Sequence, residues 1–277
     1  MTRVLVTGGG GQLGSELVPL FADVVAPVEG ALDVTDRDAV LGAVTSLRPD
    51  VIVHTAAWTA VDACEADPER AFAVNALGTR HIADGARRVG AHVVYVSTDY
   101  VFDGAKADPY HEWDDTGPLS VYGASKLAGE RELDPGSTVV RTSWLFGRQG
   151  GNFVKTVLRL AAEPGELRMV ADQRGHPTFA ADLAAVLHRL ALDRRPGVFH
   201  VTNQGATTWF DLAREILALA GSDPSRVVPI TSNELARPAV RPPNSVLDNV
   251  ALRQSGIPLA PDHHEPLERL VKELVTP

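Results

Sequence analysis

The sequence has few of the features that mark secreted or membrane-embedded proteins. It contains one cysteine, Cys64, so an intramolecular disulfide is impossible. We expect Cys64 to be buried, and we expect the protein to work in a reducing compartment, the cytoplasm. No apolar run approaches the roughly 18 residues of a membrane span. Residues 2–6 resemble a strand, and not a charged leader followed by a signal core. We therefore expect no membrane partner.

Positive charge is also scarce. The formal net charge is -9, and the basic residues form no cluster. Nucleic-acid binding requires a basic surface that neutralises phosphates, so we expect no nucleic-acid partner. None of the nine histidines shows metal-ligand spacing, and the adjacent pair His263 and His264 is expected in an exposed loop. The sequence thus predicts no metal site.

Short apolar runs alternate with longer amphipathic stretches, which is typical of βαβ units around a parallel sheet. The expected strands cover residues 4–7, 23–26, 51–54, 92–97, 138–142 and 198–201. The expected helices cover residues 12–21, 36–47 with a cap at Thr35, 68–89 as one helix or two, 121–133, 152–162, 180–192 and 266–274. Residues 233–244 are rich in proline and arginine and are expected to form loops.

This pattern predicts an α/β fold with a doubly wound parallel sheet of the Rossmann type. We expect residues 1–150 to form a dinucleotide-binding domain, to which a segment at about 175–202 returns. Residues 151–174 and 203–277 are expected to form a smaller, discontinuous substrate-binding lobe. Such a lobe would lie over the carboxyl ends of the strands, where open α/β sheets bind ligands.

A glycine cluster follows the first expected strand. It fits G-x-G-x-x-G from Gly9, or G-x-x-G-x-x-G through Gly8, Gly11 and Gly14. In either register the glycines permit a tight turn and let backbone N–H groups approach a diphosphate at a helix N-terminus. The position of the cluster between a strand and a helix favours dinucleotide binding over a merely structural turn.

The acidic residue that usually binds the adenosine ribose is missing from the end of the second strand, residues 26–28. Glu29 and Asp33 follow it. We expect Asp33 to face the adenine, with a solvated turn residue as the alternative. No arginine or lysine marks a pocket for a 2′-phosphate, so the sequence leaves NADPH and NADH open as coenzymes.

Tyr122 and Lys126 lie one helical turn apart and therefore share a face. An ammonium beside a phenol lowers the phenol pKa from about 10, and such a phenol can protonate a carbonyl oxygen as hydride reaches the carbon. Lysine is rare in this chain, which makes the pair informative, although a surface helix could carry it by accident. Upstream, Thr98 or Ser97 ends a strand and is expected to hydrogen-bond the substrate carbonyl, with a plain strand-end cap as the alternative.

The glycine loop, the strand-end hydroxyl and Y-x-x-x-K occur in this order in the extended short-chain dehydrogenase/reductase superfamily, which the chain resembles. Further segments resemble the dTDP-4-dehydrorhamnose reductase family; they are residues 96–104, 141–147, 151–153, 172–178 and 241–245. The resemblance covers nearly the full length. One departure is Trp58, where a smaller or polar residue is expected.

The resemblance implies NADPH- or NADH-dependent reduction of the C4 ketone of dTDP-4-dehydro-6-deoxy-L-mannose to dTDP-L-rhamnose. It implies Tyr122 as proton donor, assisted by Thr98 and Lys126. The implied coenzyme contacts, besides Tyr122 and Lys126, are Gly8, Gly11, Gln12, Leu13, Gly14, Asp33, Val34, Ala56, Ala57 and Thr59. The implied substrate contacts are Thr98, Asp99, Trp144, Asn152 and Arg241. Arg174 and Arg237 are further candidates to bind the anionic substrate.

Some members of this family dimerise through a magnesium ion held by glutamates. Glu16 and Glu273 match two of these positions, but Asp182 stands where the third glutamate is expected. We therefore expect no such magnesium site. The sequence is compatible with a monomer or a homodimer.

The sequence also bears on other activities of the same superfamily. A dehydratase is disfavoured because Tyr100 stands where those enzymes need a glutamate after Thr98 and Asp99. A reductase or an epimerase acting on another nucleotide-linked 6-deoxysugar stays open, and so does a non-catalytic regulatory relative that binds dinucleotide. An epimerase would retain NAD and consume no net coenzyme.

Overall fold

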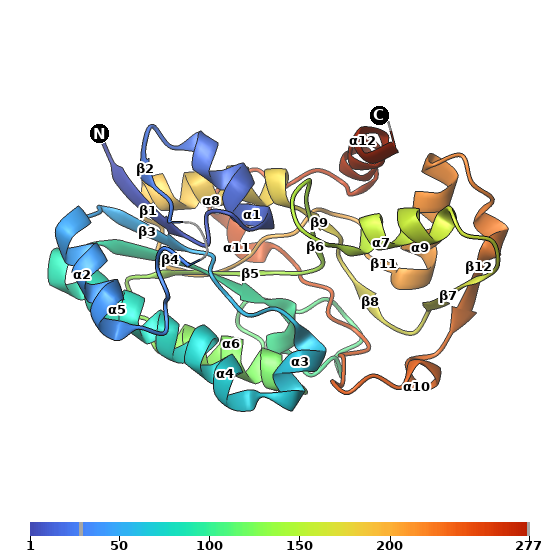
Figure 1. Ribbon diagram of the computed structural model, residues 1–277, viewed down its shortest axis with the longest axis horizontal. Coiled ribbons are helices and arrows are strands. Elements are labelled where there is room, and N and C mark those ends of the chain that lie inside the picture. The colour runs from blue at the N-terminus through green and yellow to red at the C-terminus, as the bar shows by residue number, and fades with distance from the viewer. Residues whose placement is uncertain (28–29, 276–277) are drawn as a thin grey trace.

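Six parallel strands form the central sheet of the computed structural model, which describes residues 1–27 and 30–275 (Figure 1). Glu29 lies outside the described residues. The strand order is β10-β5-β4-β3-β1-β2, and neighbouring strands are parallel throughout. The strands are β1 (Arg3–Thr7), β2 (Asp23–Val25), β3 (Val51–His54), β4 (His92–Thr98), β5 (Thr138–Thr142) and β10 (Gly197–His200). The predicted doubly wound parallel sheet is confirmed.

Helices cover both faces of this sheet (Figure 1). On one face lie α1 (Gln12–Leu17) and α8 (Ala180–Asp193), and on the other α2 (Arg37–Leu47), α5 (Gly78–Val89) and α6 (Val121–Arg131). Val4 and Val6 of β1 belong to the core under α1 and α8, whereas Leu5 belongs to the core under α2 and α5. Because successive strand residues point to opposite faces, a strand between two helical layers must be apolar at every position.

The end of α1 and the N-terminal cap of α2 differ from the sequence expectation. The segment expected as one helix over residues 12–21 is α1 followed by a 3-10 turn, Val18–Leu20, which contains Pro19. The cap of α2 is Asp36, whose carboxylate accepts from the N–H of Ala39 at 3.0 Å. The expected cap at Thr35 is wrong, because the Thr35 hydroxyl instead donates to Asp33 at 2.7 Å.

Residues 68–89 form two α-helices joined without a break. They are α4 (Pro68–Phe72) and α5, connected by a π-helical turn, Ala73–Leu77. Such turns are rare and often accompany functional sites. A shorter helix, α3 (Val61–Ala66), precedes them and was not expected from the sequence. Cys64 on α3 is buried, as expected.

The C-terminal part has its own hydrophobic core, built from residues such as Val157, Leu212, Ile216 and Leu267. Its helices are α7 (Phe153–Ala161), α9 (Trp209–Leu219), α10 (Ser232–Leu235) and α12 (His264–Val275), whereas α11 (Val250–Gln254) packs against β10 and the core of the central sheet. Its strands pair as β6 (Leu145–Phe146) with β9 (Thr178–Phe179), β7 (Leu167–Val170) with β12 (Val227–Ile230), and β8 (Arg174–Gly175) with β11 (Thr207–Thr208).

Several of these C-terminal elements escaped the sequence analysis, in particular α9 and the β7–β12 pair. In contrast, β10 pairs with β5 at the edge of the central sheet, and α8 packs on that sheet. The residue boundaries of the two expected domains stay a prediction. Throughout residues 1–27 and 30–275, a bilayer-spanning helix of sufficient length and apolarity is absent.

The expectation that His263 and His264 lie in an exposed loop is wrong, because His263 is buried and His264, although exposed, belongs to α12. His263 is 3% exposed, and its N–H donates to the carbonyl of Gln204 at 2.9 Å. His264 opens α12, two residues earlier than the sequence predicts. The Nε2 atom of His263 lies 3.4 Å from the carboxylate of Glu215 on α9, a contact that the local sequence does not reveal.

Candidate active site

A cleft lies where the strand order reverses, between β1 and β3. From β1 the chain moves to β2 on one side and then crosses to β3 on the other, so the loops after β1 and β3 diverge at this point. The cleft has a volume of about 410 Å³ and is open to solvent on one side. Its lining comprises Gly8, Gly11, Gln12, Leu13, Gly14, Thr55, Ala57, Thr59, Val61, Val96, Ser97, Thr98, Asp99, Tyr100, Tyr122, Lys126, Thr142, Ser143, Trp144, Leu145 and Trp209.

The glycine loop enters the cleft in the G-x-x-G-x-x-G register. Gly8 has a φ of 71°, and the N–H of Gly11 donates to its carbonyl at 3.0 Å. A Cβ on Gly14 would lie 2.3 Å from the Gly8 oxygen, so only glycine lets α1 approach the loop this closely. Gly11 precedes α1 without a capping side chain. The first N–H groups of α1 therefore stay available to an anion such as a diphosphate.

Hydrogen bonds from Asn75 of the π-helical turn hold the loop after β3 in place. The Asn75 side chain accepts from the N–H of Trp58 at 2.8 Å and donates to the Trp58 carbonyl at 3.1 Å and to Ser125 at 2.9 Å. One buried amide thus ties this loop to α6, next to Lys126. The Trp58 ring lies outside the cleft lining and packs under the guanidinium of Arg70, 4.5 Å from the ring centroid.

Helix α6 carries Tyr122 and Lys126 into the cleft. Ser120 caps it by accepting from the N–H of Gly123 at 3.2 Å, which places Tyr122 in the first turn. A Cβ on Gly123 would lie 2.1 Å from the Tyr100 carbonyl, so the glycine lets α6 pack against the end of β4. The spacing expected from the sequence is realised, and both side chains line the same cleft.

Lys126 is 2% exposed, and its ammonium lies 4.1 Å from the centroid of the Tyr95 ring. Burial lowers the pKa of Lys126 to about 7, while the negative charge of Glu130 acts in the opposite direction. Glu130 is itself paired with Arg141 at 2.7 Å and accepts from Ser97 at 2.5 Å. The lysine is therefore close to a balance between its charged and neutral forms near neutral pH.

The pKa of Tyr122 is raised above its ordinary value, mainly because the phenol is buried. A hydrogen bond with Thr98 favours the phenolate, but the charge of Asp99 opposes it. The expected lowering of the Tyr122 pKa is wrong, because desolvation of the phenol outweighs the contacts that favour the phenolate. Tyr122 therefore holds its proton at neutral pH.

Thr98 and Asp99 lie at the carboxyl end of β4, next to Tyr122. The Thr98 hydroxyl donates to Asp99 at 3.0 Å and accepts from the N–H of Tyr100 at 3.2 Å. Burial raises the pKa of Asp99 to about 7, although hydrogen bonds from Ser245 and Thr98 act against it. Within the described part of the chain, the second carboxyl oxygen, Oδ2, has no hydrogen-bond partner.

Two tryptophans close the side of the cleft that faces the C-terminal part. The rings of Trp144, after β5, and Trp209, at the start of α9, stack with centroids 3.6 Å apart. Trp144 was predicted from the sequence as a substrate contact, but Trp209 was not, because α9 was not predicted. Thr55 and Thr142 were also missed, although hydroxyls at the ends of β3 and β5 are signals that could have found them.

Five residues implied by the resemblance lie outside the lining of this cleft. Asp33 accepts from Thr35, Val34 is buried, and the Ala56 N–H donates to Thr7 at 3.4 Å. The remaining two, Asn152 and Arg241, contact other parts of the protein.

Asn152 and Arg241 support the walls of the cleft indirectly. Asn152 caps α7 and donates to the side chain of Gln12 at 3.0 Å. Arg241 forms a two-pronged ion pair with Asp62 of α3, both contacts at 2.9 Å, and Arg237 joins the same carboxylate at 3.3 Å. Arg174, the third arginine candidate, lies on β8 and is exposed.

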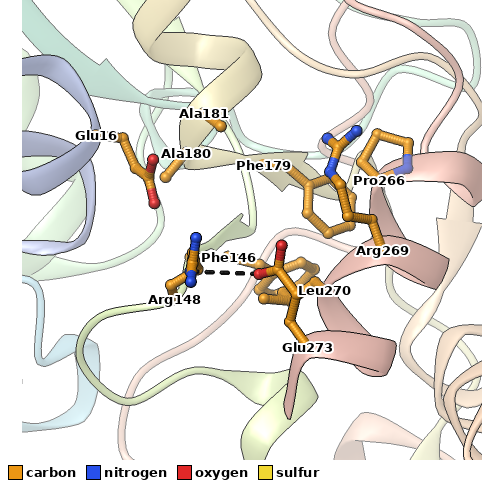
Figure 2. Close-up of a pocket in the computed structure, with 11 residues that line it drawn as sticks. Glu16, Phe146, Arg148, Phe179, Ala180, Ala181, Pro266, Arg269, Leu270 and Glu273 are labelled. Carbon is orange, nitrogen blue, oxygen red and sulfur yellow. Dashed lines mark ion pairs between the residues drawn. The ribbon is translucent and has the colours of Figure 1, made fainter. Parts of the chain in front are cut away.

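The residues matched to a magnesium site lie at a second pocket, between α1, α8 and α12 (Figure 2). Glu16 and Glu273 line it together with Arg148 and Arg269, and Arg148 pairs with Glu273 at 3.3 Å. Asp182 is outside the pocket lining; it accepts from Asn203 at 2.7 Å and lies 3.9 Å from the guanidinium of Arg269. Two guanidinium groups therefore share this pocket with the two carboxylates.

A glycine turn after β1, a cleft at the strand-order reversal and a buried Tyr–Lys pair together define an oxidoreductase of the short-chain dehydrogenase/reductase class. The parallel sheet, the glycine loop and the position of the Tyr–Lys pair on α6 are all typical of this class. The chain belongs to the family described as RmlD substrate binding domain, whose model matches residues 1–276.

Individual proteins of known name are also similar to this chain. The chain is 49% identical over 268 residues to the dTDP-4-dehydrorhamnose reductase of Streptomyces griseus, covering 92% of this chain and 88% of the relative. It is 44% identical to a probable dTDP-4,6-dihydroxy-2-methyloxan-3-one 4-ketoreductase of Streptomyces antibioticus, with coverages of 92% and 90%. The solved structure of dTDP-4-dehydrorhamnose reductase from Bacillus anthracis in complex with NADP superposes with a TM-score of 0.94 at 39% identity, over 98% and 99% of the two chains.

Proposed function

We propose that the protein reduces the C4 ketone of dTDP-4-dehydro-6-deoxy-L-mannose to dTDP-L-rhamnose, with NADPH or NADH as coenzyme. The observation that carries this proposal is the buried group of Thr98, Tyr122 and Lys126 beside the glycine loop in one cleft. The relatives named dTDP-4-dehydrorhamnose reductase, one of them in complex with NADP, support the substrate and the coenzyme.

The residues of the cleft fit a dinucleotide. The glycine loop leaves no side chain between the cleft and the first N–H groups of α1, and a Cβ at Gly14 would destroy this arrangement. Gly8, Gly11 and Gln12 would hold the diphosphate, and Ala57 and Thr59 would line the neighbouring part of the coenzyme site. When bound, the reduced nicotinamide supplies the hydride for the carbonyl carbon.

The protein itself supplies the proton. Tyr122 holds its phenolic proton at neutral pH because burial raises its pKa, so it is ready to donate to the carbonyl oxygen as negative charge develops there. Thr98 hydrogen-bonds Tyr122 and can stabilise the same oxygen. Lys126, on the same face of α6, can stabilise the phenolate that remains and hold ribose hydroxyls.

The far side of the cleft suits a nucleotide sugar. The stacked Trp144 and Trp209 present aromatic surface next to Thr98 and Asp99, and hydroxyls of Thr142 and Ser143 add hydrogen-bonding groups. A flat aromatic wall with a few polar groups is typical of sites that bind sugar and base rings. The single, buried Cys64 supports a reducing compartment such as the cytoplasm. Both a monomer and a homodimer are compatible with this proposal.

A reductase for a different dTDP-linked 6-deoxysugar is the second candidate. The 44% identical relative from Streptomyces antibioticus is named as a ketoreductase of another dTDP-sugar. The two activities share the Tyr–Lys chemistry and differ in the configuration of the sugar that the cleft accepts. Product stereochemistry therefore separates them.

The test is the oxidation of NADPH and NADH by purified protein given dTDP-4-dehydro-6-deoxy-L-mannose, with the product identified by NMR. In Tyr122→Phe we expect substrate-dependent oxidation to fall by about 100-fold or more, because general acid catalysis contributes roughly that factor. Tyr110→Phe is the matched control, since Tyr110 is buried and donates to Asp103 at 2.6 Å but lies outside the cleft lining.

Two results would reject the rhamnose proposal. Protein that binds dinucleotide but oxidises neither coenzyme with this substrate would direct attention to another sugar or to a regulatory role. Conversion of a nucleotide sugar without net coenzyme consumption would indicate an epimerase.

A further inference from the structure

A glutamate and two histidines meet on the C-terminal side of the molecule, away from the proposed catalytic cleft. Glu215 lies on α9, and His263 and His264 lie at the start of α12. The Nε2 atom of His263 is 3.4 Å from one Glu215 oxygen, and the Nδ1 atom of His264 contacts the other. One ligand atom from each residue lies within 4.8 Å of the others.

Both rings are oriented by neighbouring oxygen atoms. The Nδ1 atom of His263 lies 3.2 Å from the carbonyl of Gln204 and can donate its proton there, while Nε2, the nitrogen left for a metal ion, faces the Glu215 carboxylate. The backbone N–H of His264 donates to Asp262 at 3.1 Å, and the same carboxyl oxygen lies 3.7 Å from Nε2 of His264. Metal-binding histidines commonly have such a carbonyl or carboxylate behind the ring, because it fixes the tautomer and strengthens the ligand nitrogen.

We propose that Glu215, His263 and His264 bind a divalent transition-metal cation of the Zn²⁺ class. Two imidazole nitrogens and one carboxylate are a ligand set that suits Zn²⁺, whereas Mg²⁺ and Ca²⁺ prefer oxygen ligands only. Zn–N and Zn–O bonds of about 2.0–2.1 Å require tetrahedral ligand atoms roughly 3.3 Å apart, so side chains with atoms within 4.8 Å need only small movements.

The burial of the cluster fits an ion with one solvent ligand. His263 is 3% exposed, Glu215 is half-buried, and His264 is exposed. Three protein ligands then hold the ion from the inside, and the open side next to His264 admits a water molecule as the fourth ligand. A simple His–Glu ion pair is the competing explanation, and it requires no ion.

A metal ion at this position would connect three segments that are distant in the sequence. They are α9 through Glu215, α12 through His264, and the segment around Gln204 through the ring of His263. Helix α9 begins with Trp209 in the cleft, and α12 contributes Arg269 and Glu273 to the pocket of Figure 2. We expect the ion to hold α12 against α9, and we assign it no step in the reduction.

The test is a titration of the EDTA-treated, full-length protein with ZnCl₂, followed by calorimetry and by the melting temperature. Wild-type protein is expected to bind one Zn²⁺ and to melt at a higher temperature as Zn²⁺ increases. Co²⁺ in place of Zn²⁺ should give the visible absorption of a tetrahedral site. Glu215→Gln and His264→Gln should each weaken Zn²⁺ binding by at least 10-fold and remove the Co²⁺ band.

The variants are chosen so that misfolding cannot explain the result. His264 is exposed, so His264→Gln is expected to fold normally, which circular dichroism and dinucleotide binding would show. His111→Gln is the matched control, because His111 also faces a carboxylate, Asp248, at 3.7 Å, but among the described residues it belongs to no group of three possible metal ligands. Equal Zn²⁺ binding by wild type and His264→Gln, or no saturable binding by wild type, would overturn the proposal and leave an ion pair.

Discussion

Trp144 and Trp209 stack with their ring planes 12° apart and their centroids at 3.6 Å, which joins the central sheet to the C-terminal part of the chain. Trp144 adopts a left-handed φ of 41°, and a Cβ on Gly175 would lie 2.6 Å from its ring. Trp209 donates from its indole N–H to Gln173 at 3.2 Å. The stack is therefore held from both sides, and it shapes the cleft before substrate binds.

Trp209→Ala is expected to raise KM for the nucleotide sugar by about 10-fold with little change in kcat. The substitution removes aromatic surface and the support of Trp144, which affects substrate and transition state alike. Steady-state kinetics at saturating coenzyme would measure it, with Trp113→Ala as the control because Trp113 is 64% exposed and outside the cleft lining. A fall in kcat at unchanged KM would contradict this role.

Lys126 should give the reaction a pH dependence near neutrality. Its pKa in the free protein is about 7, below the ordinary value, so the ammonium is present below that pH and is lost as the pH rises. The pH dependence of kcat/KM for the coenzyme reflects the pKa values of groups in the enzyme before it binds coenzyme. If the ammonium is the active form, this kcat/KM should fall above about pH 7.

Lys126→Arg and Lys126→Met are the informative variants for this prediction. Arginine stays charged throughout and should flatten the profile, whereas methionine should lower kcat/KM by about 100-fold below pH 7, with a difference from wild type that narrows as the lysine loses its proton at higher pH. Profiles that keep the same inflection in wild type and Lys126→Arg would assign the titration to another group.

Asp99 is expected to lower stability as the pH rises. Its pKa is raised to about 7 by burial, so between about pH 4 and pH 7 the folded state binds a proton that the unfolded state has released. The free energy of unfolding should therefore fall over this range, relative to Asp99→Asn, by on the order of 3 kcal/mol.

Urea unfolding of wild type and Asp99→Asn at a series of pH values measures this difference. Asp38→Asn serves as the control, because the Asp38 side chain is 97% exposed and should leave the pH dependence unchanged. A constant difference between wild type and Asp99→Asn from pH 4 to pH 8 would show that the folded carboxyl has an ordinary pKa.

Gly14→Ala is expected to weaken dinucleotide binding by at least 10-fold. Its Cβ would lie 2.3 Å from the Gly8 carbonyl and push α1 away from the loop. Calorimetric titration with NADPH and NADH would measure the loss. Gly42→Ala is the matched control: it lies within α2 with open space around its Cβ, and alanine there should stabilise the protein by about 0.5–1 kcal/mol. Equal dinucleotide affinity in both variants would contradict the assigned loop geometry.

The sequence by itself determined the central sheet and the position of the Tyr–Lys pair. Strands buried on both faces need continuous apolar runs such as residues 51–54, and the 3.6-residue helical period places Tyr122 and Lys126 on one face. The glycine loop was equally visible, because a close approach of the backbone requires glycine. These features depend on residues near one another in the chain.

The tertiary structure alone decided the features that depend on distant segments and on burial. Helix α9 brings Trp209 to Trp144 and Glu215 to His263, and α3 brings Asp62 to Arg241. The direction of the Tyr122 pKa shift also differs from the sequence expectation, because spacing shows the neighbouring lysine but not the loss of water around the phenol. Contact and solvation are properties of the packed molecule, and no local pattern of residues encodes them.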